Sequence, residues 1–570
     1  MGNATSSTHS SGCTNIESTM ERIDSPTLIQ ETSALVVSEK TEKTEKTEKT
    51  HRRNVSSVTA TTFRSSLIYA PPHDLPYDEA TKSYHAFLHD YPEYKLTWTL
   101  DALRRNDFGR LDRSGETYVD YMGGALYPES LIRAHTDFLH RSVLGNTHSV
   151  SNSSKLSADY ADEARTEVLR FFNASKDYTV IFTANTSAAL KLIGESFPFA
   201  AGSSYVLGTD SHNSLHGIRE YALEKGASVC YIPSTPTGGL NLSTAKNVLL
   251  RNRPQSPVLV PSLFALTGQS NISNCKNPMS VAAYATSLGY YTLVDAAALA
   301  PTSTFSLSEH PVDAIAVSFY KMFGFPTGIG ALVVKKSFLA QLKRPWFAGG
   351  TVDLVQVPGT VVTRALEPHE RFEDGTINYL SLPAVTEGLR FLSAYLPFLP
   401  LRLSCLLNYL ITSLCDVRHD ATGNPVVRIL SRIPERRVTG IGEQSETGST
   451  ISLVFLDADG GMLPNSFIEF SASQRCISLR TGCVCNPGGA AAMLNLQDVM
   501  ARFYQGVTLQ DVEKSVGREI GVVRISLGLA SNFQDVWQVV QYAKAIGTQK
   551  SRECMWNQWR EITGGSHVVH

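Results

Sequence analysis

The chain has 570 residues, enough for two or three domains with sizeable cores. Hydrophobic residues make up 42% of it, as in a soluble globular protein, and a formal net charge of −2 gives no general attraction to nucleic acid or anionic membranes. The nine cysteines show no disulfide-like spacing, and the one close pair, Cys483 and Cys485, lacks the second ligand pair of a structural zinc site. We therefore expect a cytoplasmic protein with reduced cysteines and no metal site.

Residues 1–75 differ in composition from the rest of the chain. They are rich in Ser, Thr, Glu and Lys, and a Lys-Thr-Glu repeat fills residues 40–50. Such a segment cannot bury enough apolar surface to offset its conformational entropy, so we expect a disordered tail. The residues around Gly2 fit the N-myristoylation pattern, and Cys13 could take a second acyl chain, which would add a weak membrane association. A chance match in a flexible tail is the alternative.

Strand-like and helix-like segments alternate after a first strand at 117–121 and a helix at 156–172. Strands are expected at 178–182, 204–207, 229–232, 258–264 and 291–294, and helices at 187–197, 214–225 and 278–288. Two further apolar, strand-like runs flank Lys321. This alternation predicts an α/β fold with a mainly parallel sheet, whose ligands gather at the carboxyl ends of the strands.

The pattern changes after Lys321. Residues 376–414 read as mostly helical, and strands at 451–456 and 522–527 surround a helix at 464–473. The most membrane-like run, 391–415, is interrupted by two prolines and an arginine, so it predicts a buried helix pair and no transmembrane segment. We expect a large domain (126–345), a small α+β domain (346–548) and a C-terminal tail (549–570). The N-terminal segment (76–125) should join the small domain.

Lys321 lies among aromatic and small residues. An unpaired ammonium is costly to bury, and one way to remove the cost is to consume the charge in a Schiff base with pyridoxal phosphate (PLP). The alternative is a lysine that extends outward from the end of a strand.

Two other strand ends carry groups that suit such a cofactor. Asp295 ends an apolar strand, where it could pair with a protonated pyridine nitrogen or simply cap the next helix. Thr186 and Ser187 open a helix after a small-residue turn, which suits a phosphate but also suits ordinary capping. His212 and Asn271 follow further strands; the histidine could stack on a flat ring, or lie solvated in its loop, and the asparagine could bind the ring's phenolic oxygen.

A glycine- and proline-containing loop carries Arg480, Cys483 and Cys485. Cysteine beside arginine on an exposed loop is the setting that lowers a thiol pKa and makes the sulfur nucleophilic. Arg524 lies inside an otherwise apolar strand, and a buried arginine requires a carboxylate, which an amino-acid substrate would supply.

Three motifs in the same order resemble the class V aminotransferase-like, PLP-dependent cysteine desulfurases, above all the N-terminal domain of molybdenum cofactor sulfurases. They are Ser-Phe-Tyr-Lys-Met-Phe-Gly-Phe-Pro-Thr-Gly around Lys321, Phe-Glu-Asp-Gly-Thr-Ile around Thr376, and Arg-Thr-Gly-Cys-Val-Cys-Asn-Pro-Gly around Cys485. The resemblance covers residues 95–548. It implies the PLP-dependent transferase fold type I, with a seven-stranded sheet, and a homodimer.

The resemblance also implies roles for single residues. Lys321 is the expected Schiff-base lysine and Cys485 the expected persulfide-forming cysteine, with Arg524 on the substrate carboxylate and Arg480 beside it. The cofactor contacts expected are Asp295 at the pyridinium, His212 stacked on the ring, Asn271 at the ring oxygen, Asn185, Thr186, Ser318 and Tyr320 around the phosphate, and Thr376 reaching the neighbouring subunit's cofactor.

The sequence departs from the family in three places. Little remains after residue 546, so we expect the family's C-terminal molybdenum-cofactor-binding domain to be missing. The motif after Asp120 reads Tyr-Met-Gly-Gly-Ala where His-Ala-Gly-Ala is usual, and Asn274 replaces a usual glycine. The last two lie near the expected cofactor.

The expected reaction takes sulfur from L-cysteine as a persulfide on Cys485, releases alanine and passes the sulfur to an acceptor. The acceptor, molybdenum cofactor or a separate protein, stays open. Two alternatives remain: a PLP-dependent C–S lyase acting on a cysteine conjugate, which needs no persulfide cysteine, and an inactive scaffold protein of the same fold. In the desulfurase, Cys483 would be the weaker candidate for the nucleophile; it would either relay sulfur or have only a packing role.

Overall fold

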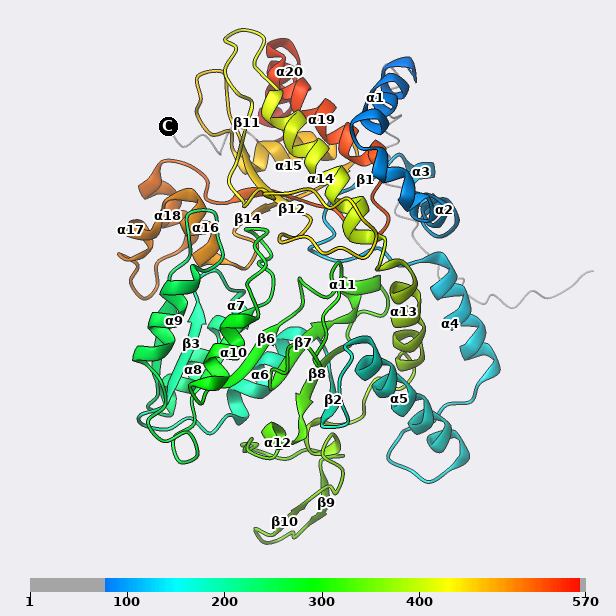
Figure 1. Cartoon of the computed structure of the whole chain (residues 1–570), viewed down its shortest axis with the longest axis vertical. Coiled ribbons are helices and arrows are strands. Elements are labelled where there is room, and N and C mark those ends of the chain that lie inside the picture. The colour runs from blue at the N-terminus through cyan, green and yellow to red at the C-terminus, as the bar shows by residue number, and fades with distance from the viewer. Residues whose placement is uncertain (1–76, 564–570) are drawn as a thin grey trace, which may run out of the picture. The chain divides into compact units, whose positions relative to one another are not determined.

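The computed structural model describes residues 77–563, which lie in one compact unit (Figure 1). The predicted tail and its acylation pattern lie outside the described residues. A seven-stranded sheet has the order β2-β8-β7-β6-β5-β3-β4. Its strands are β2 Tyr178–Thr183, β3 Ser204–Gly208, β4 Ser228–Ile232, β5 Leu263–Thr267, β6 Tyr291–Asp295, β7 Ala314–Ser318 and β8 Gly330–Lys335. Strands β3 to β7 run parallel and β8 runs antiparallel to both its neighbours, which confirms the mainly parallel α/β sheet.

Helices cover both faces of this sheet, and the sequence of β5 shows why. Phe264 and Leu266 join one apolar core, whereas Leu263 and Ala265 join the other, so the strand is apolar throughout. The first core includes residues of α5 (Asn152–Phe171), α9 (Leu242–Arg251), α10 (Ser280–Ser287) and α13 (Leu382–Tyr395). The second includes residues of α6 (Thr186–Ser196), α7 (Asn213–His216), α8 (Ile218–Glu224) and α12 (Lys336–Leu339).

Strand β5 begins later than predicted. Residues 257–259 form a turn and 260–262 lack regular structure; the side chains of Val258 and Leu259 are 92% and 80% exposed. Pro257 and Pro261 flank this apolar run, and proline cannot donate to a strand ladder. The apolar run alone was therefore a misleading strand signal.

A second sheet is antiparallel, with the order β11-β12-β15-β14. Its strands are β11 Val427–Ile429, β12 Thr450–Phe455, β14 Arg480–Gly482 and β15 Val522–Ser526. The accompanying helices are α14 Leu399–Asp416, α15 Asn465–Ser473, α16 Pro487–Leu494, α17 Gln497–Met500, α18 Leu509–Val516 and α19 Phe533–Gly547.

The N-terminal elements are α1 Tyr77–Asp90, η1 Pro92–Thr97, α2 Trp98–Asp107, α3 Gly109–Ser114, β1 Thr117–Tyr118 and α4 Glu129–Arg141. Strand β1 pairs in parallel with β13 (Ile477–Ser478).

Two buried arginines join the N-terminal helices to the C-terminal half of the chain. Arg104 on α2 donates to Asp535 on α19 at 2.7 Å, and both side chains are almost fully buried. Arg402 on α14 is fully buried, binds Asp101 and lies 4.6 Å from the centroid of the Tyr94 ring. Breaking such a pair leaves a buried charge without compensation, so these contacts hold the N-terminal segment in place.

The C-terminal region is more ordered than predicted. Residues 549–563, expected as part of a tail, form helix α20 (Gln549–Thr563). Trp559 on this helix is 2% exposed and its ring lies 5.8 Å from that of Phe467 on α15. Burial of large aromatic side chains explains why a segment of mixed polarity packs as a helix.

Within residues 77–563, no single helix is long and apolar enough to cross a membrane. Helices α13 and α14, which are bent by 66° relative to each other, pass that test only as a pair, by length and composition.

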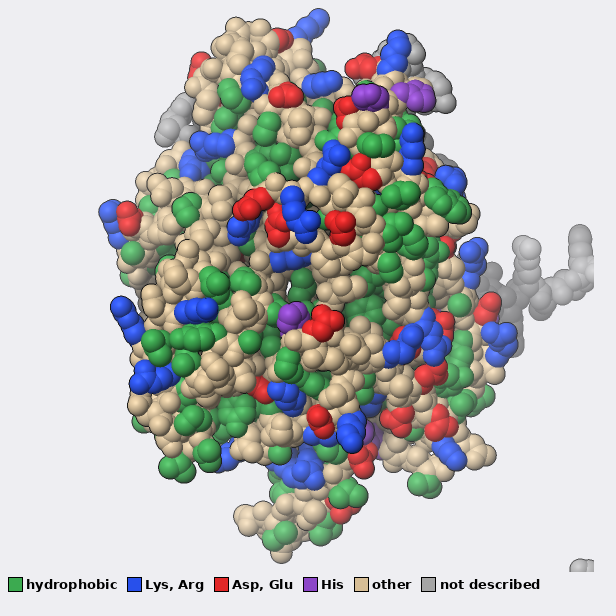
Figure 2. Space-filling model, viewed as in Figure 1, with side chains coloured by type: hydrophobic (Ala, Val, Ile, Leu, Met, Phe, Trp, Pro, Cys, Tyr) green, Lys and Arg blue, Asp and Glu red, His purple; other side chains and the backbone are tan. Residues whose placement is uncertain are grey.

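A short hairpin, β9 (Val352–Val355) and β10 (Val362–Arg364), extends from the rest of the described chain at the bottom of Figure 1. It exposes Leu354, Val357 and Val361. Elsewhere on the face shown in Figure 2, basic and acidic side chains are interspersed.

Candidate active site

A cavity of about 140 Å³ opens where parallel strands of the large sheet end. Eight predicted site residues line it: Asn185, Thr186, His212, Asn271, Asp295, Ser318, Tyr320 and Lys321. They follow β2, β3, β5, β6 and β7, which is why residues far apart in sequence meet at one place. The lining also includes Ser187, Ser214, Thr267, Gln269, Ala297 and Ala298.

Lys321 lies on α11 (Phe319–Phe323), the short helix that follows β7. Burial is the main influence on its ammonium and lowers the pKa; Arg524 and Arg480 lower it further, while the negative charges of Asp295 and Cys485 oppose the shift. Among the described residues its nitrogen has no hydrogen-bond or ion-pair partner. A lysine so placed is more often neutral, and therefore more nucleophilic, than an exposed one.

Asp295 ends β6 and is 7% exposed. Its Oδ1 accepts from the backbone N–H of Ala297 at 3.0 Å, which is the capping role foreseen as the alternative. Oδ2 accepts no hydrogen bond from a described residue, so one carboxylate oxygen is available to a ligand in the cavity. The cap and the ligand contact are therefore compatible.

The N-terminus of α6 forms the part of the cavity that suits a phosphate. The N–H and the hydroxyl of Thr186 lie 2.8 and 2.7 Å from the Ser318 oxygen, and the Ser187 and Ser214 hydroxyls lie 2.6 Å apart. Asn185 caps the helix by accepting from the Ala188 N–H at 3.0 Å. The Ser187 N–H has no partner among the described residues, and together with the surrounding hydroxyls at the start of an eleven-residue helix it forms a favourable anion site.

Gly330 allows this helix start to lie close to β8. A Cβ at this glycine would lie 2.5 Å from the Val317 carbonyl oxygen and 2.7 Å from backbone atoms of Asn185. The glycine near the end of the lysine motif is therefore required by packing around the anion site.

His212 caps α7 and is partly buried. Its Nδ1 accepts from the Ser214 N–H at 3.1 Å, so that nitrogen carries no proton. Burial is the largest influence on the imidazole and lowers its pKa, with Lys321 adding to the effect and Asp295 opposing it. A neutral ring is the form that stacks on an aromatic ligand without the desolvation cost of a charge.

The side-chain amide of Asn271 contacts the cysteine loop. Its Nδ2 donates to the Val484 carbonyl at 2.7 Å, and its Oδ1 accepts from Asn486 Nδ2 at 3.0 Å. Asn486 is fully buried, caps α16 through Gly489, and donates to Asp210 at 2.7 Å. The link between the cavity and the cysteine loop was not predicted from the sequence.

Asp210 anchors this link. Its buried carboxylate accepts from Asn486, from the Ser270 and Ser273 hydroxyls at 2.6 Å, and from the Gly239 N–H at 2.7 Å. A charged group held by four donors needs no cation to remain buried. The only sequence signal was an aspartate two residues before His212.

Cys485 is exposed and does not line the cavity, but its charge acts on Lys321. Val484 and Cys485 both have a left-handed backbone, with φ of 43° and 58°. Such angles are unfavourable for these residues, and two bonds help to maintain them: Asn271 binds the Val484 carbonyl, and the Asn213 N–H donates to the Cys485 carbonyl at 2.8 Å. The loop is thereby tied to residues beside the cavity.

Cys483 has a different environment. It lines a mostly apolar cavity of about 270 Å³ between α16, α17 and α18. Burial raises the pKa of its thiol, and the neighbouring charges of Glu513 and Cys485 add to the shift. This is the environment of a poorly reactive thiol, which favours a packing role.

Arg524 is 2% exposed, and its carboxylate partner is part of the protein. Its guanidinium binds Asp120 at 2.7 Å and the Asn271 carbonyl at 3.1 Å, while Nε has no partner among the described residues. Arg480, half exposed, binds the other oxygen of Asp120 at 2.7 Å. Neither arginine lines the cavity, so a substrate carboxylate would have to share them with Asp120.

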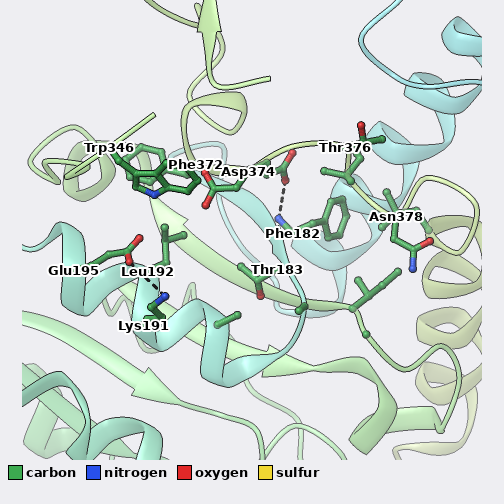
Figure 3. A pocket seen from close by; sticks show the side chains of 17 residues that line it. Phe182, Thr183, Lys191, Leu192, Glu195, Trp346, Phe372, Asp374, Thr376 and Asn378 are labelled. Carbon is green, nitrogen blue, oxygen red and sulfur yellow. Dashed lines mark hydrogen bonds and ion pairs between the residues drawn. The ribbon is translucent and has the colours of Figure 1, made fainter. Parts of the chain in front are cut away.

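Thr376 lies outside the cavity that holds Lys321. It is exposed at a second cavity of about 380 Å³ (Figure 3). Asn146 donates to its hydroxyl at 3.1 Å. Its motif is held by Glu373, which binds Arg165 at 2.7 Å through both oxygens and accepts from the Phe182 N–H at 2.7 Å. The motif around Thr376 therefore includes a structural residue, Glu373, near an exposed one.

The substitution of Asn for Gly at position 274 also has a structural basis. Asn274 is fully buried with φ of 66°, a conformation that asparagine tolerates better than most residues. Its Oδ1 accepts from the Thr450 N–H at 2.9 Å, which the hydrogen atom of a glycine could not do. The side chain thus ties the cavity wall to the second sheet.

Comparison with known proteins places this geometry in a family context. Residues 117–397 match the family model of aminotransferase class-V. Molybdenum cofactor sulfurase of Bos taurus is 34% identical over 80% of this chain and 52% of its own length, and that of Solanum lycopersicum is 33% identical over 78% and 57%. The chain thus spans about half the length of the curated relatives it matches.

Solved structures agree in fold. A cysteine desulfurase from Thermococcus onnurineus superposes with a TM-score of 0.62 at 21% identity, over 78% of this chain and 97% of that one. The cysteine desulfurase CsdA from Escherichia coli gives 0.59 at 19% identity, over 80% and 98%. The chain is similar to molybdenum cofactor sulfurases over about four-fifths of its length, and its residues 117–397 match the aminotransferase class-V family model.

Proposed function

We propose that the chain is a PLP-dependent cysteine desulfurase that moves sulfur from L-cysteine onto Cys485 and releases alanine. The observation that carries the proposal is one cavity in which a buried lysine, a carboxylate and a helix N-terminus converge, with a cysteine loop tied to its wall. The names of the homologues and of the structural neighbours support it.

The cavity residues fit PLP as a donor set. The N-terminus of α6 with Thr186 and Ser318 suits the phosphate, the free oxygen of Asp295 suits a protonated ring nitrogen, and the unpaired Lys321 suits the aldehyde. When bound, PLP would supply an electron sink for the substrate's α-carbon. His212 would cover the ring.

The protein's own groups then have separate tasks. Lys321, with its lowered pKa, takes the proton from the α-carbon of cysteine. The thiolate of Cys485 attacks the substrate sulfur: a sulfur–sulfur bond forms, the carbon–sulfur bond breaks, and the carbon that loses sulfur gains a proton, which yields alanine. Arg524 and Arg480 would orient the substrate carboxylate, and both arginines would be shared between that carboxylate and Asp120.

We also propose a homodimer in which exposed Thr376 contacts the cofactor of the other subunit. Its position outside its own chain's cavity supports this arrangement. The sulfur acceptor is proposed to be molybdenum cofactor or a separate protein. The first is suggested by the name of the relatives, about half of whose length this chain matches.

The proposal is tested by a single turnover of PLP-loaded protein with L-cysteine. We expect one alanine per active site and one additional sulfur on Cys485, located by mass spectrometry. Cys485→Ser should lose the persulfide and most of the alanine, whereas the matched variant Cys483→Ser should keep both. Pyruvate and ammonia without a persulfide would instead indicate a C–S lyase.

A further inference from the structure

Asn271 and Gln269 both line the cavity, but only the asparagine has partners in the protein. Asn271 uses one donor on the Val484 carbonyl and its oxygen on Asn486. Gln269 is 1% exposed, and neither its Nε2 nor its Oε1 has a partner among the described residues. Because buried amides are almost always hydrogen-bonded, this exception points to a partner that binds from the cavity.

The surroundings of Gln269 accommodate its amide. A Cβ on Gly448 would lie 2.2 Å from Nε2 and 2.6 Å from Cδ of Gln269, so only a glycine leaves the space that this amide fills. The preceding residue, Gly268, donates its N–H to the carbonyl of Asp295 at 2.9 Å. Gln269 therefore comes directly after a backbone hydrogen bond to Asp295, the residue whose carboxylate lines the cavity.

We propose that Gln269 makes the hydrogen bond to the bound cofactor ring that was expected of Asn271, and that Asn271 is a positioning residue for Cys485. The inference rests on the proposed function. It divides two tasks between neighbouring amides: Gln269 contacts the ligand, and Asn271 keeps the strained Val484–Cys485 backbone in place by binding the Val484 carbonyl.

The two roles are separated by two isosteric variants of the full-length, PLP-loaded protein. Gln269→Met removes the free amide, and Asn271→Leu removes the bond to the cysteine loop. For each we would measure the dissociation constant of PLP, the pH midpoint of the visible absorption band, and the number of persulfides on Cys485 per alanine released.

We expect Gln269→Met to shift the pH midpoint and to weaken PLP binding about tenfold, as for the loss of one hydrogen bond from a buried site, with persulfide per alanine unchanged. Asn271→Leu should leave the band and its pH midpoint in place but lower persulfide formation on Cys485 about tenfold. A band that moves in Asn271→Leu and not in Gln269→Met would overturn the inference.

A second variant keeps the test of the ligand contact valid if Gln269→Met fails to fold. Gly448→Ala leaves both amides in the sequence but displaces that of Gln269, so it should reproduce the spectral shift of Gln269→Met; an unchanged band would contradict the ligand contact. Absence of any visible band in the wild-type protein would overturn the proposal that it binds PLP. A wild-type band without a persulfide on Cys485 would overturn the proposed desulfurase activity, and the Gln269 contact could still be measured from the band.

Discussion

Two partly buried lysines differ in the partner of the ammonium group. Lys321 faces the cavity without a hydrogen bond, whereas Lys276 donates to the Ser445 carbonyl at 2.9 Å. Burial lowers the pKa of Lys276 to about 8, with Glu446 opposing the shift. Lys276 lies away from the cavity lining, so its titration reports on folding and not on the reaction.

The stability of the protein should therefore depend on Lys276 above neutral pH. The folded pKa of about 8 lies below the ordinary value of 10.5, so between these pH values the unfolded chain binds more protons and the free energy of unfolding rises with pH. The shift corresponds to on the order of 3 kcal/mol. We expect Lys276→Gln to lack this rise, as measured by urea unfolding at pH 7.5, 9 and 10.5; parallel curves for the two proteins would contradict it.

Single residues were predicted best where a strand end fixes their place. Lys321, Asp295 and Thr186 each follow an apolar run, and the rule that ligands collect at strand ends brings them together. The tasks of Gln269 and Asn271 were not predictable, because they depend on Val484, Gly448 and other residues about 180 to 215 positions away along the chain. The substrate role of Arg524 is complicated in the same way by Asp120.

At the scale of elements, the segment 372–377 shows how one motif combines support and exposure. Glu373 fixes it to α5 through Arg165 and to β2 through the Phe182 N–H, both from a buried position. The adjacent Asp374 binds Arg344 at 2.8 Å but its side chain is 40% exposed. Neighbouring carboxylates thus differ mainly in burial.

This difference yields a matched pair of variants. Glu373→Gln should lower the free energy of unfolding by about 3–5 kcal/mol, because it removes the buried counter-charge of the Arg165 guanidinium and leaves it only the exposed Asp162 at 3.7 Å. Asp374→Asn should cost about 1 kcal/mol or less, because Asp374 is 40% exposed and the Arg344 guanidinium keeps the carboxylate of Glu195 at 3.8 Å as a counter-charge. Denaturant unfolding measures the free energy of unfolding of both variants. Equal losses in the two would show that the Arg165–Glu373 pair does not stabilise the fold more than the Arg344–Asp374 pair does.

Element boundaries were predicted where the apolar pattern and the flanking residues agree, as for β2, β6 and β7. Strand β5 was misplaced because an apolar run between two prolines imitates a strand, and α20 was missed because its packing partner, Phe467, comes from a distant helix. The flanking prolines decided the first case, and tertiary burial, which the local pattern does not contain, decided the second.

At the scale of the molecule, exposed apolar residues gather near Thr376. Trp346 and Phe347 are 54% and 40% exposed, and Leu354 and Val357 on the β9–β10 hairpin are 60% and 85% exposed. Trp346 and Thr376 line the same cavity (Figure 3). Exposed apolar groups of this kind are typical of an interface, which agrees with the proposed homodimer.

Mixed dimers test whether Thr376 acts on the other subunit. Lys321→Ala and Thr376→Val chains should each be impaired alone. If Thr376 completes the partner's site, a mixed dimer has one site with both residues intact, because its lysine and its threonine come from different chains. Random mixing of equal amounts makes half of the dimers mixed, so about a quarter of the sites should regain persulfide formation. If Thr376 served its own chain, mixing would restore nothing, because the Lys321→Ala chain would keep its only intact threonine beside a missing lysine.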